Sequence, residues 1–198
     1  MPRLSTIVAA GTLLAASTAS AAFGVGVRVL LFVTSDCPIS NGYAPEVRRI
    51  CDRYRTDGVS CTLVYEDVRI DGPAVHAHKI EYGLEPIPSV IDRDRQIAST
   101  AGATVTPQAV VFDRDGTLRY RGRIDNRYAA FGQPRQQITR HDLRDALSAV
   151  VAGKPVATTE TEALGCFIVA PSHITPETET SCGSSSALSH RLSLLSFR

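Results

Sequence analysis

One stretch of sequence decides the fold: Val27-Arg28-Val29-Leu30-Leu31-Phe32-Val33-Thr34-Ser35-Asp36-Cys37-Pro38. Its first seven residues are almost all apolar, which is typical of a strand buried on both faces of a sheet. The polar turn that follows ends the strand, and apolar residues then recur at helical spacing over residues 40–56. The sequence therefore predicts that Cys37 lies between a central strand and the start of a helix.

The chain beyond this point alternates between strand and helix patterns. The expected strands cover residues 27–33, 59–65, 109–112 and 118–121. The expected helices cover residues 40–56, 73–83, a short segment at 95–101, and a last helix after Thr139, its predicted N-cap. Asp113-Arg114-Asp115-Gly116 is typical of a hairpin turn, and residues 123–138 are expected to form a polar loop. This order predicts an α/β sheet with flanking helices and a C-terminal β-hairpin.

Both ends of the chain differ from this body in composition. Residues 1–22 have the pattern of a secretory signal peptide, with Arg3, an apolar stretch and a small-residue cleavage site at Ala19-Ser20-Ala21. The alternative is an uncleaved anchor or a disordered end. The folded domain is expected over residues 23–155, and the polar residues 156–198 are expected to be a largely disordered tail. Export implies a periplasmic or extracellular location, and no later stretch is apolar enough to span a membrane once the signal is cleaved.

Charge and cysteine content exclude several classes of function. The formal net charge of +1 implies no broad attraction to nucleic acid or to an anionic membrane. The five cysteines are Cys37, Cys51, Cys61, Cys166 and Cys182, and none forms a Cys-x-x-Cys pair. A zinc site is therefore poorly supported, and no metal or cofactor is predicted. Cys51 and Cys61 fall on predicted core faces and are expected to be buried packing residues, although in an oxidising compartment the cysteines can pair.

The position of Cys37 suits a reactive thiol. Unpaired backbone N–H groups at a helix N-terminus stabilise a thiolate, which is the nucleophile in disulfide exchange and in peroxide reduction. The neighbouring carboxylate of Asp36 opposes this effect. The alternative is that Cys37 serves only as a small buried apolar residue.

Two segments together resemble the thioredoxin superfamily. Residues 32–40 are similar to its active-site strand and turn, and Val105-Thr106-Pro107 before an apolar strand is similar to its cis-proline segment. The resemblance covers residues 27–152 and is closest to the redoxin and peroxiredoxin-like branch of exported bacterial proteins. It implies a cis Thr106–Pro107 bond, with Pro107 facing Cys37 and with the backbone before Pro107 pairing with the extended chain of a substrate.

The departures from the family pattern bear on the chemistry. Ser40 stands where a dithiol thioredoxin has its second cysteine; it either donates a hydrogen bond to the Cys37 thiolate or caps the helix. Of the peroxiredoxin pattern, Thr34 is present, but Leu30 replaces a proline and no arginine stands before the third strand. Cys166 follows a glycine, as often in this branch, and is a candidate resolving thiol; the alternatives are a structural disulfide and an idle thiol.

The leading hypothesis is a thiol-disulfide oxidoreductase of the cell envelope. Cys37 is its nucleophile, Thr106 and Pro107 shape the substrate groove, and Cys166 or an external thiol resolves the intermediate. The expected partners are protein or small-molecule thiols and disulfides. One alternative is a peroxiredoxin-like thiol peroxidase. Another is a non-enzymatic thioredoxin-like module for binding or copper handling, although the Cys-x-x-x-Cys that copper favours is absent.

Overall fold

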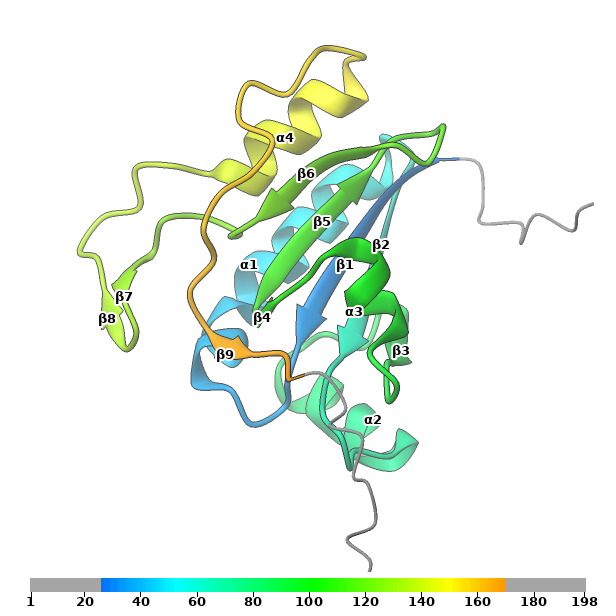
Figure 1. Ribbon diagram of the computed structural model, residues 1–198, viewed down its shortest axis with the longest axis vertical. Coiled ribbons are helices and arrows are strands. Elements are labelled where there is room, and N and C mark those ends of the chain that lie inside the picture. Colours follow the sequence, from blue (N-terminus) through cyan, green and yellow to red (C-terminus); the bar gives the residue numbers. More distant parts are fainter. Residues whose placement is uncertain (1–25, 170–198) are drawn as a thin grey trace, which may run out of the picture. The chain divides into compact units, whose positions relative to one another are not determined.

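A computed structural model of the protein describes residues 26–169 (Figure 1). The predicted signal peptide at residues 1–22 and the tail from residue 170 onward lie outside the described residues. The strands of the main sheet are β1 (Val27–Val33), β2 (Val59–Tyr65), β3 (Ser89–Ile91), β5 (Gln108–Phe112) and β6 (Leu118–Gly122). The helices are α1 (Pro38–Arg55), α2 (Gly72–Glu81), α3 (Gln96–Ala101) and α4 (Asp142–Val151).

The five strands lie in the order β3-β2-β1-β5-β6, which places β1 at the centre. β1 runs parallel to β2 and antiparallel to β5, and the β5–β6 hairpin forms the far edge of the sheet. The predicted strand at 59–65 has the bounds of β2, and those at 109–112 and 118–121 each differ from β5 and β6 by one residue. The predicted α/β class, with a thioredoxin-like sheet and a C-terminal hairpin, is confirmed.

Helices cover both faces of the sheet, which explains why β1 is apolar throughout. Successive side chains of a strand point to opposite faces. Leu31 packs in one core with Ile50 of α1 and Leu143 of α4. Phe32 packs in a second core with Ala98 of α3. In Figure 1, α1 crosses behind the sheet and α3 lies in front of it.

The start of α1 lies two residues before its predicted position. Cys37 has an extended backbone (φ −86°, ψ 112°) and is the N-cap, and Pro38 is the first helical residue, a position where its missing N–H costs nothing. Ser40 therefore lies inside the first turn, and its predicted alternative role as N-cap is wrong.

The polar loop at 123–138 contains more structure than its composition indicates. It forms a small antiparallel pair, β7 (Tyr128–Ala130) with β8 (Gln133–Pro134). Thr139 does not cap α4, which begins at Asp142 with His141 as N-cap. Instead, the Thr139 hydroxyl accepts a hydrogen bond from Asn126 Nδ2 at 2.8 Å, and Asn126 Oδ1 accepts from the Thr139 N–H at 2.9 Å. The Asn126 side chain, from the other side of the loop, therefore binds both the hydroxyl and the N–H of Thr139. Spacing along the sequence cannot reveal such a contact.

Part of the expected tail packs on the body. We call residues 159–168 the strap. The Arg121 N–H donates to the Thr159 carbonyl at 2.9 Å, and the Thr161 N–H donates to the Arg121 carbonyl at 3.1 Å. Farther along, β9 (Cys166–Phe167) pairs antiparallel with β4 (Val105–Thr106). The disorder expected from residue 156 is therefore wrong for the strap, because main-chain pairing with open strand edges holds a polar segment that composition alone would leave unstructured.

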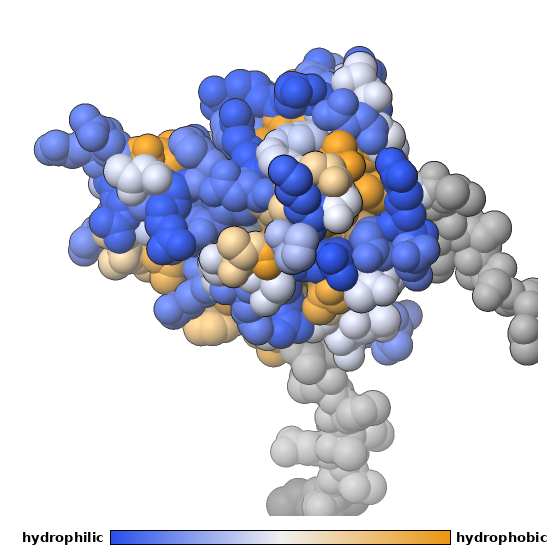
Figure 2. All heavy atoms as spheres, turned by 90° about the horizontal axis from the view of Figure 1, so that it is seen from above, coloured by the Kyte–Doolittle hydropathy of each residue, from blue (hydrophilic) through white to orange (hydrophobic). Residues whose placement is uncertain are grey.

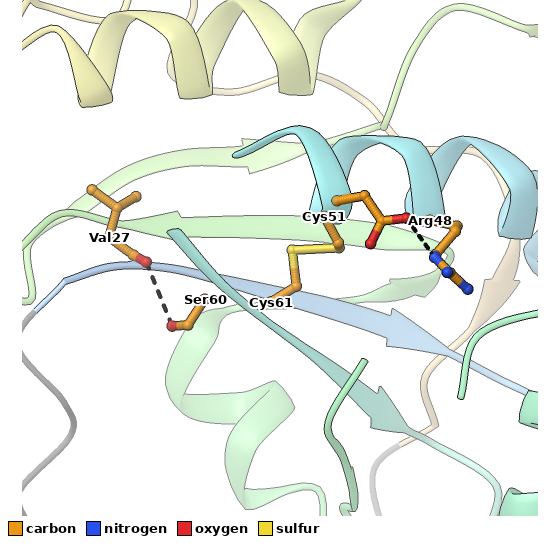
Figure 3. The surroundings of a disulfide bond; sticks show 6 residues. Val27, Arg48, Cys51, Ser60 and Cys61 are labelled. Atoms are coloured by element: carbon orange, nitrogen blue, oxygen red, sulfur yellow. Dashed lines mark hydrogen bonds and ion pairs between the residues drawn. A yellow bond between two sulfur atoms is a disulfide. The ribbon is translucent and has the colours of Figure 1, made fainter. Parts of the chain in front are cut away.

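Cys51 and Cys61 form a disulfide, and their predicted role as separate packing thiols is corrected (Figure 3). Both are buried, as expected, but the buried face of α1 meets β2 so that their Cα atoms lie 5.9 Å apart, within the range that a disulfide spans. The bond joins α1 to the strand that follows it.

The surface seen in Figure 2 is mostly hydrophilic, and its apolar residues form small separate groups. No broad apolar patch marks a docking surface on that face. Within residues 26–169, none of the helices has the length and apolarity needed to cross a membrane.

Candidate active site

Cys37 is almost completely buried, with an exposed fraction of 1%. Its Sγ lies 3.6 Å from the carbonyl oxygen of Thr106, to which the thiol donates. The Thr106–Pro107 peptide bond is cis, as the sequence predicted. The hydroxyls of Thr34 and Thr106 lie 3.1 Å apart, so the cysteine turn and the proline segment contact each other directly.

Cys166 reaches the same place from the other end of the chain. The pairing of β9 with β4 sets Cys166 opposite Thr106, and its Sγ lies 3.1 Å from the Sγ of Cys37. Neither sulfur is in a disulfide. The structure thus brings together every residue predicted for the site: Cys37, Ser40, Thr106, Pro107 and Cys166.

The environment lowers the pKa of Cys37. Burial is the largest influence and acts in the opposite direction, because it disfavours the charged form. Hydrogen bonds to the sulfur from the Ser40 backbone, the Cys166 thiol, the Ser40 hydroxyl and the Ile39 backbone together outweigh it. The Ser40 hydroxyl is buried and is paired with no other group, which leaves it free to donate to this sulfur. The first turn of α1 therefore stabilises a thiolate at Cys37, as its position predicted.

The contact between the two sulfurs raises the pKa of Cys166, whereas it lowers the pKa of Cys37. Burial, the hydrogen bond to Cys37 and the negative charge of Cys37 raise the pKa of Cys166 to about 11, with a smaller contribution from Asp36. The contact therefore favours ionisation of Cys37 and keeps the proton on Cys166. Two thiols of unequal acidity in contact suit disulfide exchange, in which the more acidic thiol attacks as the thiolate.

Residues outside the predicted set hold the cysteine turn in place. The carboxylate of Asp67 accepts from the Ser35 hydroxyl at 2.7 Å and from its N–H at 3.1 Å. On the other side, Asn41 Nδ2 donates to the Ser35 carbonyl at 2.9 Å. Oδ1 of the Asn41 side chain lies 2.9 Å from Nε2 of His78, and Nδ1 of that ring lies 2.8 Å from the hydroxyl of Tyr65. Burial lowers the pKa of His78, so its ring is neutral at pH 7.

Sequence reasoning missed Asp67, Asn41 and His78 as parts of the site. They come from a loop and two helices and share no spacing, so no local pattern links them. Asp125 lies in the segment that was expected to be a polar loop, but it is buried, and its Oδ1 accepts from the Tyr43 hydroxyl at 2.8 Å. It lines a small pocket with Pro107, next to the strap.

Within the described residues, no group of three or more histidine, cysteine, aspartate or glutamate side chains is arranged to hold a metal ion.

Comparison with solved structures supports the fold. A hypothetical protein from Sinorhizobium meliloti matches with a TM-score of 0.64 and 25% identity, over 75% of this chain and 81% of that one. An uncharacterized conserved protein from Geobacillus kaustophilus matches with a TM-score of 0.64 and 28% identity, over 75% and 79% of the two chains. A secreted Mycobacterium tuberculosis disulfide oxidoreductase homologous to E. coli DsbE matches at a TM-score of 0.41 and 25% identity, over 47% and 66%. No protein-family model matches the chain, and no curated protein matches it either.

The two matches with a TM-score of 0.64 cover most of the body that the structure describes. The arrangement within that body is also specific: a turn after the central strand leads to Cys37, α1 starts directly after it, and the carbonyl of Thr106, before the cis Pro107, lies 3.6 Å from the sulfur. The strand order and the position of these residues show that the chain has a thioredoxin-like fold.

Proposed function

We propose that the protein is a thiol-disulfide oxidoreductase of the cell envelope, with Cys37 as the nucleophile and Cys166 as the resolving cysteine. One observation carries the proposal: the two sulfurs lie 3.1 Å apart, in contact and unbonded. The shared contact lowers the pKa of Cys37 and raises that of Cys166, which assigns the two roles.

The reaction consists of two exchanges. The Cys37 thiolate attacks one sulfur of a substrate disulfide, the substrate S–S bond breaks, and the other substrate sulfur leaves as a thiolate. Cys166 then loses its proton to solvent and attacks the Cys37 sulfur, and the second substrate thiolate leaves. The substrate gains two electrons, and the enzyme ends with a Cys37–Cys166 disulfide. An external thiol reductant returns the enzyme to its dithiol form, and oxidation of a substrate follows the same steps in reverse.

The electrostatics of the pair change during this cycle. While Cys37 is a thiolate, its charge and its hydrogen bond hold the proton on Cys166. Once Cys37 is part of a mixed disulfide it carries no charge, and both of these effects on the pKa of Cys166 are lost. Cys166 therefore becomes more acidic at the step in which it must attack, although burial still opposes its ionisation.

Location in the cell envelope is supported by two features. The first 22 residues have the pattern of a secretory signal. The Cys51–Cys61 disulfide is of a kind that persists in oxidising compartments and is rare in the cytosol.

The test is turnover of a disulfide substrate by the full chain and three variants. Cys37→Ser should abolish turnover. Cys166→Ser should still form the mixed disulfide but should need added glutathione to turn over. Cys182→Ser, which changes a cysteine outside the described residues, is the matched control and should behave as the wild type. Unchanged turnover in Cys37→Ser would refute the proposal, and fast reduction of hydrogen peroxide would favour the thiol peroxidase instead.

A further inference from the structure

We infer that the β9 end of the strap occupies the strand edge on which an extended substrate chain pairs, so that strap and substrate exclude each other. This inference rests on the proposed function and names its substrate class: a disulfide-bonded cysteine within an extended polypeptide segment. It also names a control on access, because the chain covers its own nucleophile.

The first observation is that Cys37 is inaccessible with the strap in place. Its exposed fraction is 1%, and the Cys166 sulfur lies against it at 3.1 Å. An attacking thiolate must approach a disulfide in line with the bond that breaks, which needs open space at the sulfur. No substrate disulfide can reach Cys37 until Cys166 moves away.

The second observation is the way in which β9 is seated. Thr106 lies opposite Cys166 and Val105 opposite Phe167, and the Ile168 N–H donates to the Thr104 carbonyl at 2.9 Å. The strap thus adds a short antiparallel strand to the edge that precedes Pro107. Addition of an extended peptide to an open strand edge is a general mode of peptide recognition, and here a segment of the chain itself takes that place.

Gly165 shows how closely the strap approaches. A Cβ atom added to this glycine would overlap the Thr106 carbonyl and contact the Pro107 ring. Only a residue without a side chain fits between the strap and the proline segment. A substrate segment seated in the same way would present its cysteine opposite Thr106 and a small residue immediately before that cysteine.

A second set of contacts holds the strap to the body when β9 dissociates from β4. The Thr161 hydroxyl lies 2.7 Å from the Tyr120 hydroxyl and accepts from the Arg123 N–H at 3.1 Å. Glu160 pairs with Arg121 at 2.7 Å. The five chain steps from Thr161 to Cys166 span at most about 18 Å. When β9 lifts, Cys166 therefore stays tethered close to Cys37 and keeps a high effective concentration.

These contacts give an order of events. β9 lifts, the substrate segment pairs with β4, and Cys37 forms the mixed disulfide. β9 then competes for the same edge, and its return brings Cys166 to the Cys37 sulfur. The return of β9 thus resolves the mixed disulfide and displaces the substrate strand from β4 in the same step.

The experiment measures access to Cys37. The probe is an extended peptide whose single cysteine carries a 2-thiopyridyl disulfide. All proteins carry Cys166→Ser and Cys182→Ser, so that only the first exchange at Cys37 is observed, and release of thiopyridone reports its rate. Gly165→Ala should accelerate the reaction about tenfold, the change that loss of one or two net hydrogen bonds produces. Gly72→Ala is the matched control, because a Cβ there meets nothing within 4 Å, and should leave the rate unchanged.

A second pair of variants covers the case in which Gly165→Ala perturbs folding. Ile168 is half-buried against the core that contains Phe32, whereas the neighbouring Phe167 has an exposed fraction of 82%. Ile168→Ala should accelerate the reaction in the same direction as Gly165→Ala, and Phe167→Ala should not. Equal rates in all four variants would overturn the inference.

Hydrogen exchange tests the edge itself. With the peptide trapped on Cys37, the Ile168 amide should exchange at least tenfold faster than in the free protein, since its acceptor edge is then taken. Unchanged protection of Ile168 in the trapped complex would show that the peptide binds elsewhere and would overturn the inference. These failures leave the proposed function intact, whereas reaction of the peptide in a Cys37→Ser protein would refute the proposed function.

Discussion

The charge on Cys37 depends on neutral hydrogen-bond donors in the first turn of α1. Burial raises the cost of ionising the sulfur, and donors from Ser40, Ile39 and Cys166 reverse that effect. Each such bond favours the thiolate because the donor dipole points at the charge. The acidity of the nucleophile is thus tied to the geometry of a single helical turn and to the seating of the strap.

Ser40→Ala tests the contribution of one donor. The Ser40 hydroxyl has no other partner, so its loss should raise the pKa of Cys37 and slow alkylation at pH 7 by about two- to fivefold. Above the pKa of both proteins the rates should converge, because both are then fully ionised. Alkylation followed at the Cys37 peptide by mass spectrometry across pH 5–10 measures this, with Ser60→Ala, at the far end of β2, as the control. Superimposable pH profiles would contradict the assignment.

Among the elements, a buried charged cluster connects the end of β2 to the start of α3. Arg95 Nη1 donates to Glu66 Oε2 at 2.8 Å, and the carboxylate of Asp92 accepts from the N–H groups of Ile97 and Ala98 at 3.1 and 2.8 Å. Burial, together with the charge of Asp92, raises the pKa of Glu66 to about 7 despite the opposing effect of Arg95. The cluster holds the helix that covers the face of the sheet where the strap ends.

This raised pKa predicts a pH-dependent stability. Between the ordinary carboxyl pKa of 4.5 and about 7, folded Glu66 keeps its proton while unfolded Glu66 loses it. The folded state therefore binds more protons, and its stability should fall as pH rises through this window, by about 3 kcal/mol from this group. Above pH 7 the contribution levels off.

Glu66→Gln should remove that slope. Urea unfolding at pH 5, 6, 7 and 8 measures it as the difference between the two proteins, because His78 contributes equally to both. Loss of the carboxylate partner of Arg95 shifts the free energy of unfolding of the variant at every pH and does not alter the comparison of slopes. Glu85→Gln, at an exposed position, is the control. An identical pH dependence in Glu66→Gln and the wild type would show that Glu66 does not titrate in this range.

The Cys51–Cys61 bond predicts a second effect at this scale. It closes a loop between cysteines ten residues apart, so the Cys51→Ala/Cys61→Ala double variant should be about 2–3 kcal/mol less stable in urea unfolding. Its Cys37 should react with a disulfide probe at the wild-type rate, since the bond lies on α1 and β2 away from the strap. In a Cys166→Ser background, where no Cys37–Cys166 bond can form, a reductant should then destabilise the protein that retains Cys51–Cys61 and leave the double variant unaffected. If the reductant left the stability of the protein that retains both cysteines unchanged, the Cys51–Cys61 bond would be contradicted.

At the scale of the molecule, the redox state of the active site should change global stability. A Cys37–Cys166 disulfide would join residues 129 positions apart, which encloses nearly the whole described body in one covalent loop. Chain entropy sets the maximum gain at about 5 kcal/mol. The oxidised protein should therefore unfold at higher urea than the dithiol form.

The comparison with Cys166→Ser isolates this loop. Both proteins retain Cys51–Cys61, so the redox-dependent shift of the wild type minus that of the variant reports only the Cys37–Cys166 bond. Equal shifts in the two proteins would mean that this bond either does not form or does not constrain the unfolded chain.

Local pattern determined much of the molecule. The apolar strand at 27–33, the helix after Cys37, the hairpin at Asp113–Gly116 and the cis Thr106–Pro107 bond were all predictable, because each follows from periodicity, turn chemistry or a short motif. Cys37 was predictable for the same reason, since a strand, a turn and a helix start are contiguous in sequence. β3, β7 and β8 were not, because strands of two or three residues carry too little periodicity to be detected.

Tertiary structure alone decided which distant groups meet. The sequence by itself placed Cys166 in a polar tail and left its role open, and it treated Cys51 and Cys61 as separate packing residues. The sheet order leaves the edge of β4 open, the strap fills it, and only then do the Cys37 and Cys166 sulfurs lie in contact. Periodicity reports which face of an element is buried, whereas the pairing of cysteines depends on which faces and edges come together, and that is a property of the whole folded chain.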